Sequence, residues 1–117
     1  MAEHTPQAEY ASKLTTPAKA VESIRSGSTL CIALGVGMPS GLARAFADRV
    51  LAGELKDLNL YYQHSMKYAE ETFARPEVLG LVNARNFFIG EPDRKVIEQG
   101  IREGRKYLSY IPCNFSA

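Results

Sequence analysis

The chain has 117 residues and a mass of 12.9 kDa, and its 45% hydrophobic and 23% charged residues are typical of one globular domain, which excludes a disordered chain. A formal net charge of +1 excludes the broad positive field of a nucleic-acid or membrane-surface protein. The apolar run 30–39 is about half as long as a bilayer-spanning helix and the start 1–7 lacks a signal-peptide pattern, so we expect a cytoplasmic protein without membrane or nucleic-acid partners.

The first predicted element is a helix. Segment 1–14 is polar and aperiodic, which predicts a loose lead-in, and the structured domain is expected over 15–117. Thr16 followed by Pro17 is typical of a helix N-cap and first turn, and the apolar spacing that follows predicts a helix over 17–26.

A strand and a second helix come next. The continuous apolar run within 29–34 predicts a strand buried on both faces of a parallel sheet. The glycine-rich stretch 35–39 interrupts this strand. Apolar residues at helical spacing predict a helix over 39–52, with Gly53 as its stop.

The second half of the chain alternates in the same way. Strands are predicted over 57–62, 82–89 and 107–111, and a short helix over 68–74. A further helix begins after Gly90 and ends at Gly104, with its apolar face made of Val96, Ile97 and Ile101. Strands joined by helical crossovers favour an α/β fold with a largely parallel sheet and flanking helices.

Ligands of an open parallel sheet bind beyond the carboxyl ends of its strands, where three polar loops are predicted. The first, 35–41, precedes a helix, so the N–H groups of Gly35 and Gly37 are candidate donors to an anion or an oxyanion. A tight turn that needs glycine is the structural alternative. A dinucleotide fingerprint is disfavoured because the spacing is GxGxxxG, with Ser40 where a third glycine is needed.

The second loop, 63–67, gathers an amide, an imidazole, a hydroxyl and an ammonium. His64 and Ser65 are adjacent on an extended stretch and point apart, so they do not form a nucleophile pair, and a solvated polar loop is the alternative. In the third loop, 112–116, Cys113 is expected to be a small buried residue rather than a reactive thiol.

The remaining candidates are weaker. Glu70 and Glu71 diverge on a helix, which favours a solvated face over a carboxylate pair. The arginines from Arg85 onward are interspersed with acids and are mostly expected at the surface. Two distant cysteines and two histidines do not suffice for a zinc site, so no metal is expected and both thiols are expected to be free.

These motifs, taken in order, resemble the start of the acetyl-CoA hydrolase/transferase family, and 4-hydroxybutyrate and butyryl/acetate CoA-transferases most of all. The resemblance runs from Tyr10 to the chain end. Its residues are Tyr10, Lys13 and Leu14; Ala20, Val21, Ile24, Ser26 and Gly27; the stretch Gly35-Val36-Gly37-Met38-Pro39 with Leu42; Gly90; the Gly100 region; and Tyr110-Ile111-Pro112-Cys113-Asn114-Phe115.

The resemblance implies a CoA-transferase-type α/β fold, of which this chain is the first part of the N-terminal domain. It implies transfer of CoA between an acyl-CoA and a free carboxylic acid through a glutamyl-CoA thioester. The nucleophilic glutamate is expected outside this chain, so no catalytic residue is assigned and the chain alone is expected to be inactive. Coenzyme A is implied as a substrate, with no tightly bound cofactor.

The same resemblance places five residues near the acyl group and CoA: Gly35, Gly37, Pro39, Ser65 and Asn114. The alternative hypothesis is a free-standing α/β module that binds a phosphorylated small molecule or nucleotide through the Gly35–Gly37 loop. The predicted sheet is expected to expose an apolar face and an open edge, and therefore to favour self-association.

Overall fold

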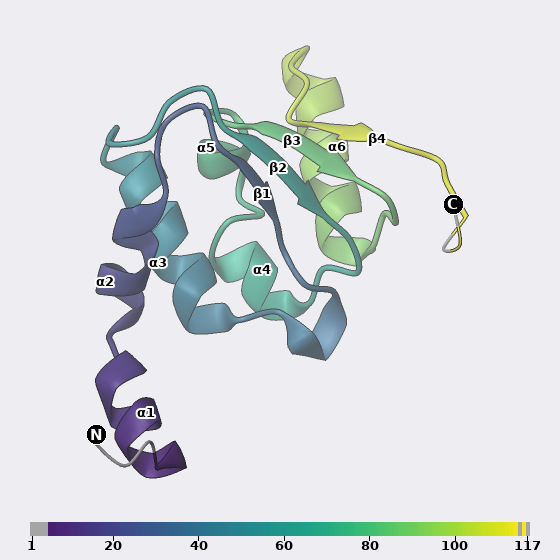
Figure 1. The fold of residues 1–117 in the computed structure, drawn as a ribbon. Helices are drawn as coiled ribbons and strands as arrows, with labels where there is room; N and C mark the ends of the chain where they lie inside the picture. The colour runs from purple at the N-terminus through teal and green to yellow at the C-terminus, as the bar shows by residue number, and fades with distance from the viewer. Residues whose placement is uncertain (1–4, 115, 117) are drawn as a thin grey trace.

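Four short strands form one parallel sheet in the order β1-β2-β3-β4 (Figure 1). The strands are β1 (Thr29–Cys31), β2 (Asn59–Tyr62), β3 (Asn83–Asn86) and β4 (Leu108–Tyr110). The coordinates are a computed structural model that describes residues 5–114 and 116. The predicted α/β fold with a parallel sheet and flanking helices is confirmed.

Helices fill the connections between the strands. Helix α3 (Ser40–Leu51) joins β1 to β2, helices α4 (Lys67–Glu71) and α5 (Pro76–Leu79) join β2 to β3, and α6 (Glu91–Glu103) joins β3 to β4. Right-handed crossovers between strands laid down in sequential order bring all these helices to the same face of the sheet. In the view of Figure 1, α3 and α4 lie below the strands and α5 and α6 lie behind them.

The core lies between the sheet and these helices. Leu30, Leu60, Ala84 and Leu108 are in register across the four strands and pack against the helical layer. From α3 the core receives its buried residues at helical spacing, which are Ala43, Phe46, Ala47 and Val50. The helix predicted over 39–52 is therefore confirmed, and Gly53 follows it with a φ of +75°.

The opposite face of the sheet is polar and aromatic, so the expectation of an exposed apolar face was wrong. Cys31, Tyr61, Arg85 and Ser109 are in register there. The Arg85 guanidinium lies 5.3 Å from the centre of the Tyr61 ring and donates a hydrogen bond to its hydroxyl. That ring also stacks on Phe87 at 5.8 Å. Aromatic rings, a guanidinium and a hydroxyl therefore take the places where a buried sheet face carries aliphatic side chains.

Strand β1 forms an open edge of the sheet. Its apolar sequence predicted a strand buried on both faces, and this prediction was wrong. Only Leu30 of its three residues is partly buried. Asn59 N–H donates to Ser28 C=O at 3.0 Å and Ile32 N–H donates to Tyr61 C=O at 2.9 Å. Alternate residues bond to the neighbouring strand in a parallel ladder, so the backbone groups of Thr29 and Cys31 point outward from the edge.

The N-terminal segment contains a helix where a loose lead-in was predicted. Helix α1 (Pro6–Lys13) is capped by the Thr5 hydroxyl, which accepts from Ala8 N–H at 3.2 Å, and none of its residues is buried. Figure 1 shows it projecting from the rest of the chain. The predicted helix 17–26 is shorter than expected, consisting of α2 (Pro17–Ala20) and the 3₁₀ turn η1 (Val21–Ser23).

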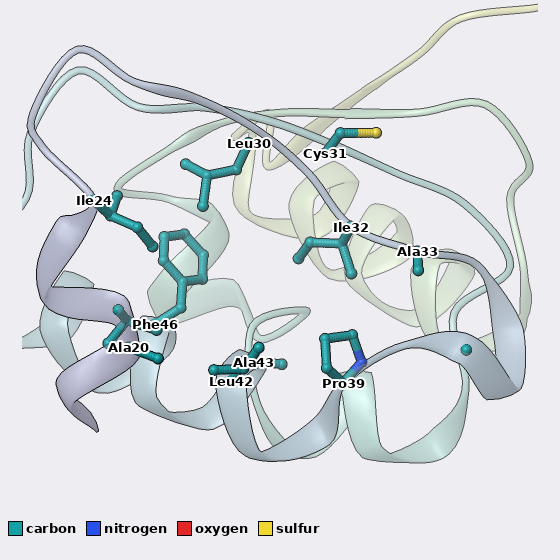
Figure 2. Close-up of a pocket in the computed structure, with 12 residues that line it drawn as sticks. Ala20, Ile24, Leu30, Cys31, Ile32, Ala33, Pro39, Leu42, Ala43 and Phe46 are labelled. Carbon is teal, nitrogen blue, oxygen red and sulfur yellow. The ribbon is translucent and has the colours of Figure 1, made fainter. Parts of the chain in front are cut away.

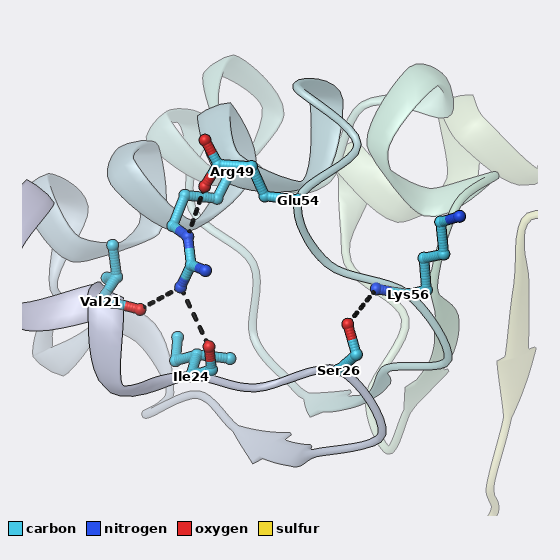
Figure 3. Close-up of polar contacts among 6 residues, drawn as sticks. All are labelled: Val21, Ile24, Ser26, Arg49, Glu54 and Lys56. Carbon is cyan, nitrogen blue, oxygen red and sulfur yellow. Dashed lines mark hydrogen bonds and ion pairs between the residues drawn. The ribbon is translucent and has the colours of Figure 1, made fainter.

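An arginine fixes the end of this shortened helix. The Arg49 guanidinium donates to the carbonyls of Val21 and Ile24 at 2.5 and 3.0 Å and to the Glu54 carboxylate at 2.8 Å (Figure 3). The Val21 carbonyl also accepts from Ile24 N–H at 3.1 Å, whereas the Ile24 carbonyl lies past the end of η1. Arg49 therefore ties the first helical segment to α3.

Three further predictions need correction. The short helix after β2 ends at Glu71, and Pro76 begins the unpredicted α5 instead of only breaking structure. The strand predicted over 82–89 extends only over Asn83–Asn86. Ile101, predicted on the buried face of its helix, is 75% exposed, although Val96 is buried and Gly104 ends the helix in the left-handed conformation as expected.

No helix in the described ranges 5–114 and 116 is long and apolar enough to cross a membrane.

Candidate functional site

The loops that follow β1 and β2 meet at the carboxyl edge of the sheet, as their parallel order requires. Gly35 begins the 3₁₀ turn η2 (Gly35–Gly37), and its N–H donates to the His64 carbonyl at 3.2 Å. The Tyr68 hydroxyl, from α4, donates to the Gly35 carbonyl at 2.5 Å. The structure therefore joins the predicted glycine loop to the predicted polar loop.

The two glycine N–H groups are not free donors, which corrects their expected role. Gly35 N–H is occupied by His64, and Gly37 N–H donates to the Leu34 carbonyl at 3.1 Å. Gly35 has a φ of +53°, a conformation that favours glycine, whereas Gly37 does not have a positive φ. The turn interpretation therefore explains Gly35. Pro39 follows as the N-cap of α3 without a side-chain hydrogen bond.

His64 holds the β2 loop in an unusual conformation. Its φ is +51°, uncommon for a residue with a side chain. Its imidazole stacks on Phe88, which follows β3, with ring centres 4.1 Å apart and planes 8° apart. Phe88 is 52% exposed. This contact therefore brings the loop after β3 to the same edge of the sheet as the loops after β1 and β2.

Ser65 enters a buried network that the sequence did not reveal. Its hydroxyl lies 3.0 Å from Asp93 Oδ1, and the hydroxyl of Tyr62, the last residue of β2, lies 3.1 Å from the same oxygen. Asp93 Oδ2 accepts from Gly90 N–H at 2.9 Å and so caps α6. Asp93 has no exposed surface, and burial together with the Asp93 charge raises the pKa of Tyr62 far above its ordinary value.

A polar pocket of about 340 Å³ opens above this network. Its lining residues are Ser65, Met66, Lys67, Glu70, Glu91, Pro92 and Lys95. The Lys95 ammonium lies 3.1 Å from the Glu70 carboxylate and 3.8 Å from that of Glu91. Glu70 therefore belongs to an ion pair between α4 and α6, and not to a carboxylate pair with Glu71.

An apolar pocket of about 420 Å³ lies between β1 and α3 (Figure 2). Figure 2 shows the side chains of Leu30 and Ile32 directed from the strand toward α3, with Phe46 and Pro39 on the other side. Gly37 also lines this pocket. Two predicted site residues thus border an apolar space beside the open sheet edge.

The loop after β4 stands apart from the others. Ile111 N–H donates to the Asn86 carbonyl at 2.9 Å, but within the described part of the chain Asn114 makes no hydrogen bond with the glycine loop or with Ser65. Cys113 is exposed rather than buried, which corrects its prediction, and both Cys31 and Cys113 are free as expected. Residue 115 of the same motif lies outside the described residues.

Sequence reasoning missed three buried polar residues beneath this edge. Asp93 was recognisable as an acid three residues after Gly90 at a helix start, which is a capping position. Tyr62 and Asn86 carried no such signal, because each resembles an ordinary strand residue. Asn86 is fully buried, accepts from Phe88 N–H at 2.7 Å, and leaves its Nδ2 without a partner among the described residues.

Comparisons with known proteins decide the family. The family model of the acetyl-CoA hydrolase/transferase N-terminal domain matches residues 1–116. The chain belongs to this family. No curated protein matches its sequence. RipA from Yersinia pestis is similar in structure, with 39% identity and a TM-score of 0.86 over 93% of this chain. A methionine-to-glycine variant of RipA gives a TM-score of 0.88 at the same identity and coverage.

The similarity extends over only part of each of these structures. The match covers 26% of the RipA chain and 25% of the variant chain. The chain therefore spans about a quarter of the length of the solved structures that it resembles.

Proposed function

We propose that this chain is the N-terminal portion of a CoA-transferase that moves CoA between an acyl-CoA and a free carboxylic acid. Family membership supports the enzyme class. The observation that carries the proposal is the joined edge at the carboxyl ends of β1 and β2. There the hydrogen bond from Gly35 to His64 unites the two loops whose residues were expected to border the substrate.

The proposed chemistry uses a glutamate from outside this chain. Its carboxylate attacks the acyl carbonyl, which breaks the thioester and gives an acyl-glutamyl anhydride and free CoA thiolate. The thiolate attacks the glutamyl carbonyl, which releases the first carboxylic acid and forms a glutamyl-CoA thioester, and the second acid takes up the CoA by the reverse of these steps and frees the glutamate. Coenzyme A is a substrate in this scheme, and no tightly bound cofactor is proposed. Gly37, Pro39 and Ser65 contribute the walls of the site, and Asn114 is placed at its margin.

The alternative of a free-standing phosphate-binding module loses its main support. That hypothesis needed the N–H groups of Gly35 and Gly37 as free donors to the ligand, and both donate to backbone carbonyls instead. A phosphate would have to displace these hydrogen bonds. The transferase proposal does not depend on these two donors.

Two measurements test the proposal. The purified 117-residue chain, incubated with acetyl-CoA and a carboxylic acid, is expected to show no CoA transfer. The full-length polypeptide carrying this chain is expected to transfer CoA. When given acyl-CoA without an acceptor, it is expected to gain a CoA thioester that peptide mapping locates on a glutamate outside this chain. Transfer by the chain alone, or a full-length protein that only hydrolyses acyl-CoA, would contradict the proposal.

A further inference from the structure

The buried network fixes the direction of the Ser65 hydroxyl proton. An ionised carboxylate only accepts hydrogen bonds, so the hydroxyls of Ser65 and Tyr62 must both donate to Asp93 Oδ1. The other carboxylate oxygen is occupied by Gly90 N–H. Asp93 has no exposed surface, so no water replaces these donors. The single proton of Ser65 is therefore directed into the protein.

This arrangement leaves the Ser65 oxygen as an acceptor toward the pocket. Ser65 is half-buried and lines the polar pocket above α6. Its hydroxyl makes one hydrogen bond in the described part of the chain, the one to Asp93. Both of its lone pairs thus remain available for a group that enters the pocket.

We propose that Ser65 determines specificity by accepting a hydrogen bond from an N–H or O–H group of the ligand, and that Asp93 is the positioning residue that sets this polarity. The inference rests on the proposed function, whose substrates include both kinds of donor. Coenzyme A carries amide N–H groups, and a hydroxy acid carries an O–H. A carboxylate, which has only acceptors, does not suit this position.

The charged side chains at the rim of the pocket favour a ligand that carries a negative charge in addition to its hydrogen-bond donor. Lys95 is matched by Glu70 and Glu91, whereas Lys67 has no ion-pair partner within the described residues. An anionic group near Lys67 is therefore attracted while the donor group of the same molecule reaches Ser65. Both CoA and a hydroxy acid combine these two features.

Two substitutions distinguish an effect of hydrogen-bond polarity at Ser65 from an effect on the cap of α6. Ser65→Ala removes the acceptor and leaves the cap between Asp93 and Gly90 intact. In Asp93→Asn the amide oxygen can still accept from Gly90 N–H, which turns its NH₂ group toward Ser65. Ser65 then accepts from this amide and directs its own proton into the pocket. The polarity offered to the ligand is reversed while the helix cap remains.

The probes are CoA, 4-hydroxybutyrate, and butyrate, which differs from the second only in lacking the hydroxyl. Calorimetric titration of the full-length polypeptide that carries this chain measures their Kd values, with Glu98→Gln on the exposed face of α6 as a matched control. Ser65→Ala is expected to weaken the donor-bearing probe that contacts this residue about three- to tenfold, as for one lost hydrogen bond. Butyrate binding should not change. The probe that responds, CoA or the hydroxy acid, identifies the source of the donor.

Asp93→Asn gives the decisive readout. It is expected to weaken the same donor-bearing probe at least as much as Ser65→Ala does, and to leave butyrate unchanged or tighter. A purely structural role of Asp93 would weaken all probes alike. Circular dichroism checks folding, and Ser65→Ala keeps the test valid if Asp93→Asn fails to fold.

The outcomes separate the two proposals. If the probes bind and both variants leave every Kd unchanged, or if butyrate weakens as much as 4-hydroxybutyrate, the Ser65 inference is overturned and the proposed function stands. If no probe binds the wild-type full-length polypeptide, the proposed function of this site fails, and the inference fails with it.

Discussion

Replacing Arg49 with methionine is expected to destabilise the chain by about 2 kcal/mol, because the substitution removes the clamp between α3 and the end of η1 (Figure 3). Methionine retains most of the apolar stem and loses only the guanidinium. Hydrogen bonds from a charged donor contribute about 1.5–3 kcal/mol each. The Arg49 side chain is 21% exposed, so water compensates part of the loss at the Val21 and Ile24 carbonyls, and we expect about 2 kcal/mol, less than the roughly 3–6 kcal/mol to which two such bonds would sum.

The ion pair with Glu54 should contribute little to this effect. The Glu54 side chain is 55% exposed, and such surface pairs contribute about 0–1 kcal/mol. Glu54→Gln is therefore the matched control, because it removes the pair and leaves both carbonyl hydrogen bonds. Its expected cost is below about 0.5 kcal/mol.

Urea denaturation followed by circular dichroism measures both variants. With a denaturant slope of about 1–3 kcal/mol per molar, Arg49→Met should lower the urea midpoint by about 1 M, and Glu54→Gln should hardly move it. Equal midpoints for Arg49→Met and the wild-type chain would refute the assigned role. A loss in Glu54→Gln as large as that in Arg49→Met would show that the ion pair, and not the carbonyl clamp, carries the stability.

Three other predictions follow from the same structure. Gly35→Ala should lower the free energy of unfolding by about 1–2 kcal/mol in chemical denaturation because Gly35 has a positive φ. Gly37→Ala should be neutral, because its new Cβ would lie 4.0 Å from the nearest side-chain atom. Equal costs for the two variants would contradict the turn assignment. The raised pKa of Tyr62 keeps its hydroxyl protonated in the folded state, so the contribution of Tyr62 to stability should be constant below about pH 10 and fall above it by about 1.4 kcal/mol per pH unit; a Tyr62→Phe variant with the same alkaline slope would disprove this cause. The open edge of β1 beside its apolar pocket should favour self-association, and sedimentation of a monomer at high concentration would count against it.

The sequence determined much of the fold through local signals. Thr16 with Pro17, and Gly53 and Gly104 after helical patterns, marked helix ends that the structure confirms. These signals are reliable because capping and left-handed turns depend on a few adjacent residues. The alternation of apolar strands with helices then sufficed for the parallel α/β class and for the order of the four strands with α3 and α6, although it missed α1 and α5.

Burial could not be derived from local pattern alone. The apolar run at β1 predicted a strand buried on both faces, but its exposure depends on whether a neighbouring strand and a covering helix exist. Ile101 has the spacing of a core residue and is exposed because α6 meets the sheet through Val96 and Ile97. Each case depends on a partner distant in sequence.

The candidate site likewise combines features that the local sequence predicts with features that only the tertiary structure decides. The sequence located Gly35, Gly37 and Ser65 at strand ends, because parallel strands place their carboxyl ends at one edge. Only the tertiary structure decided what their polar groups contact. The glycine N–H groups are taken up by carbonyls, and the Ser65 hydroxyl reaches Asp93 across 28 residues of sequence. Hydrogen-bond polarity depends on which donors and acceptors meet in space. That meeting is decided by the tertiary arrangement that brings the first turn of α6 to the end of β2, and not by the local sequence of either.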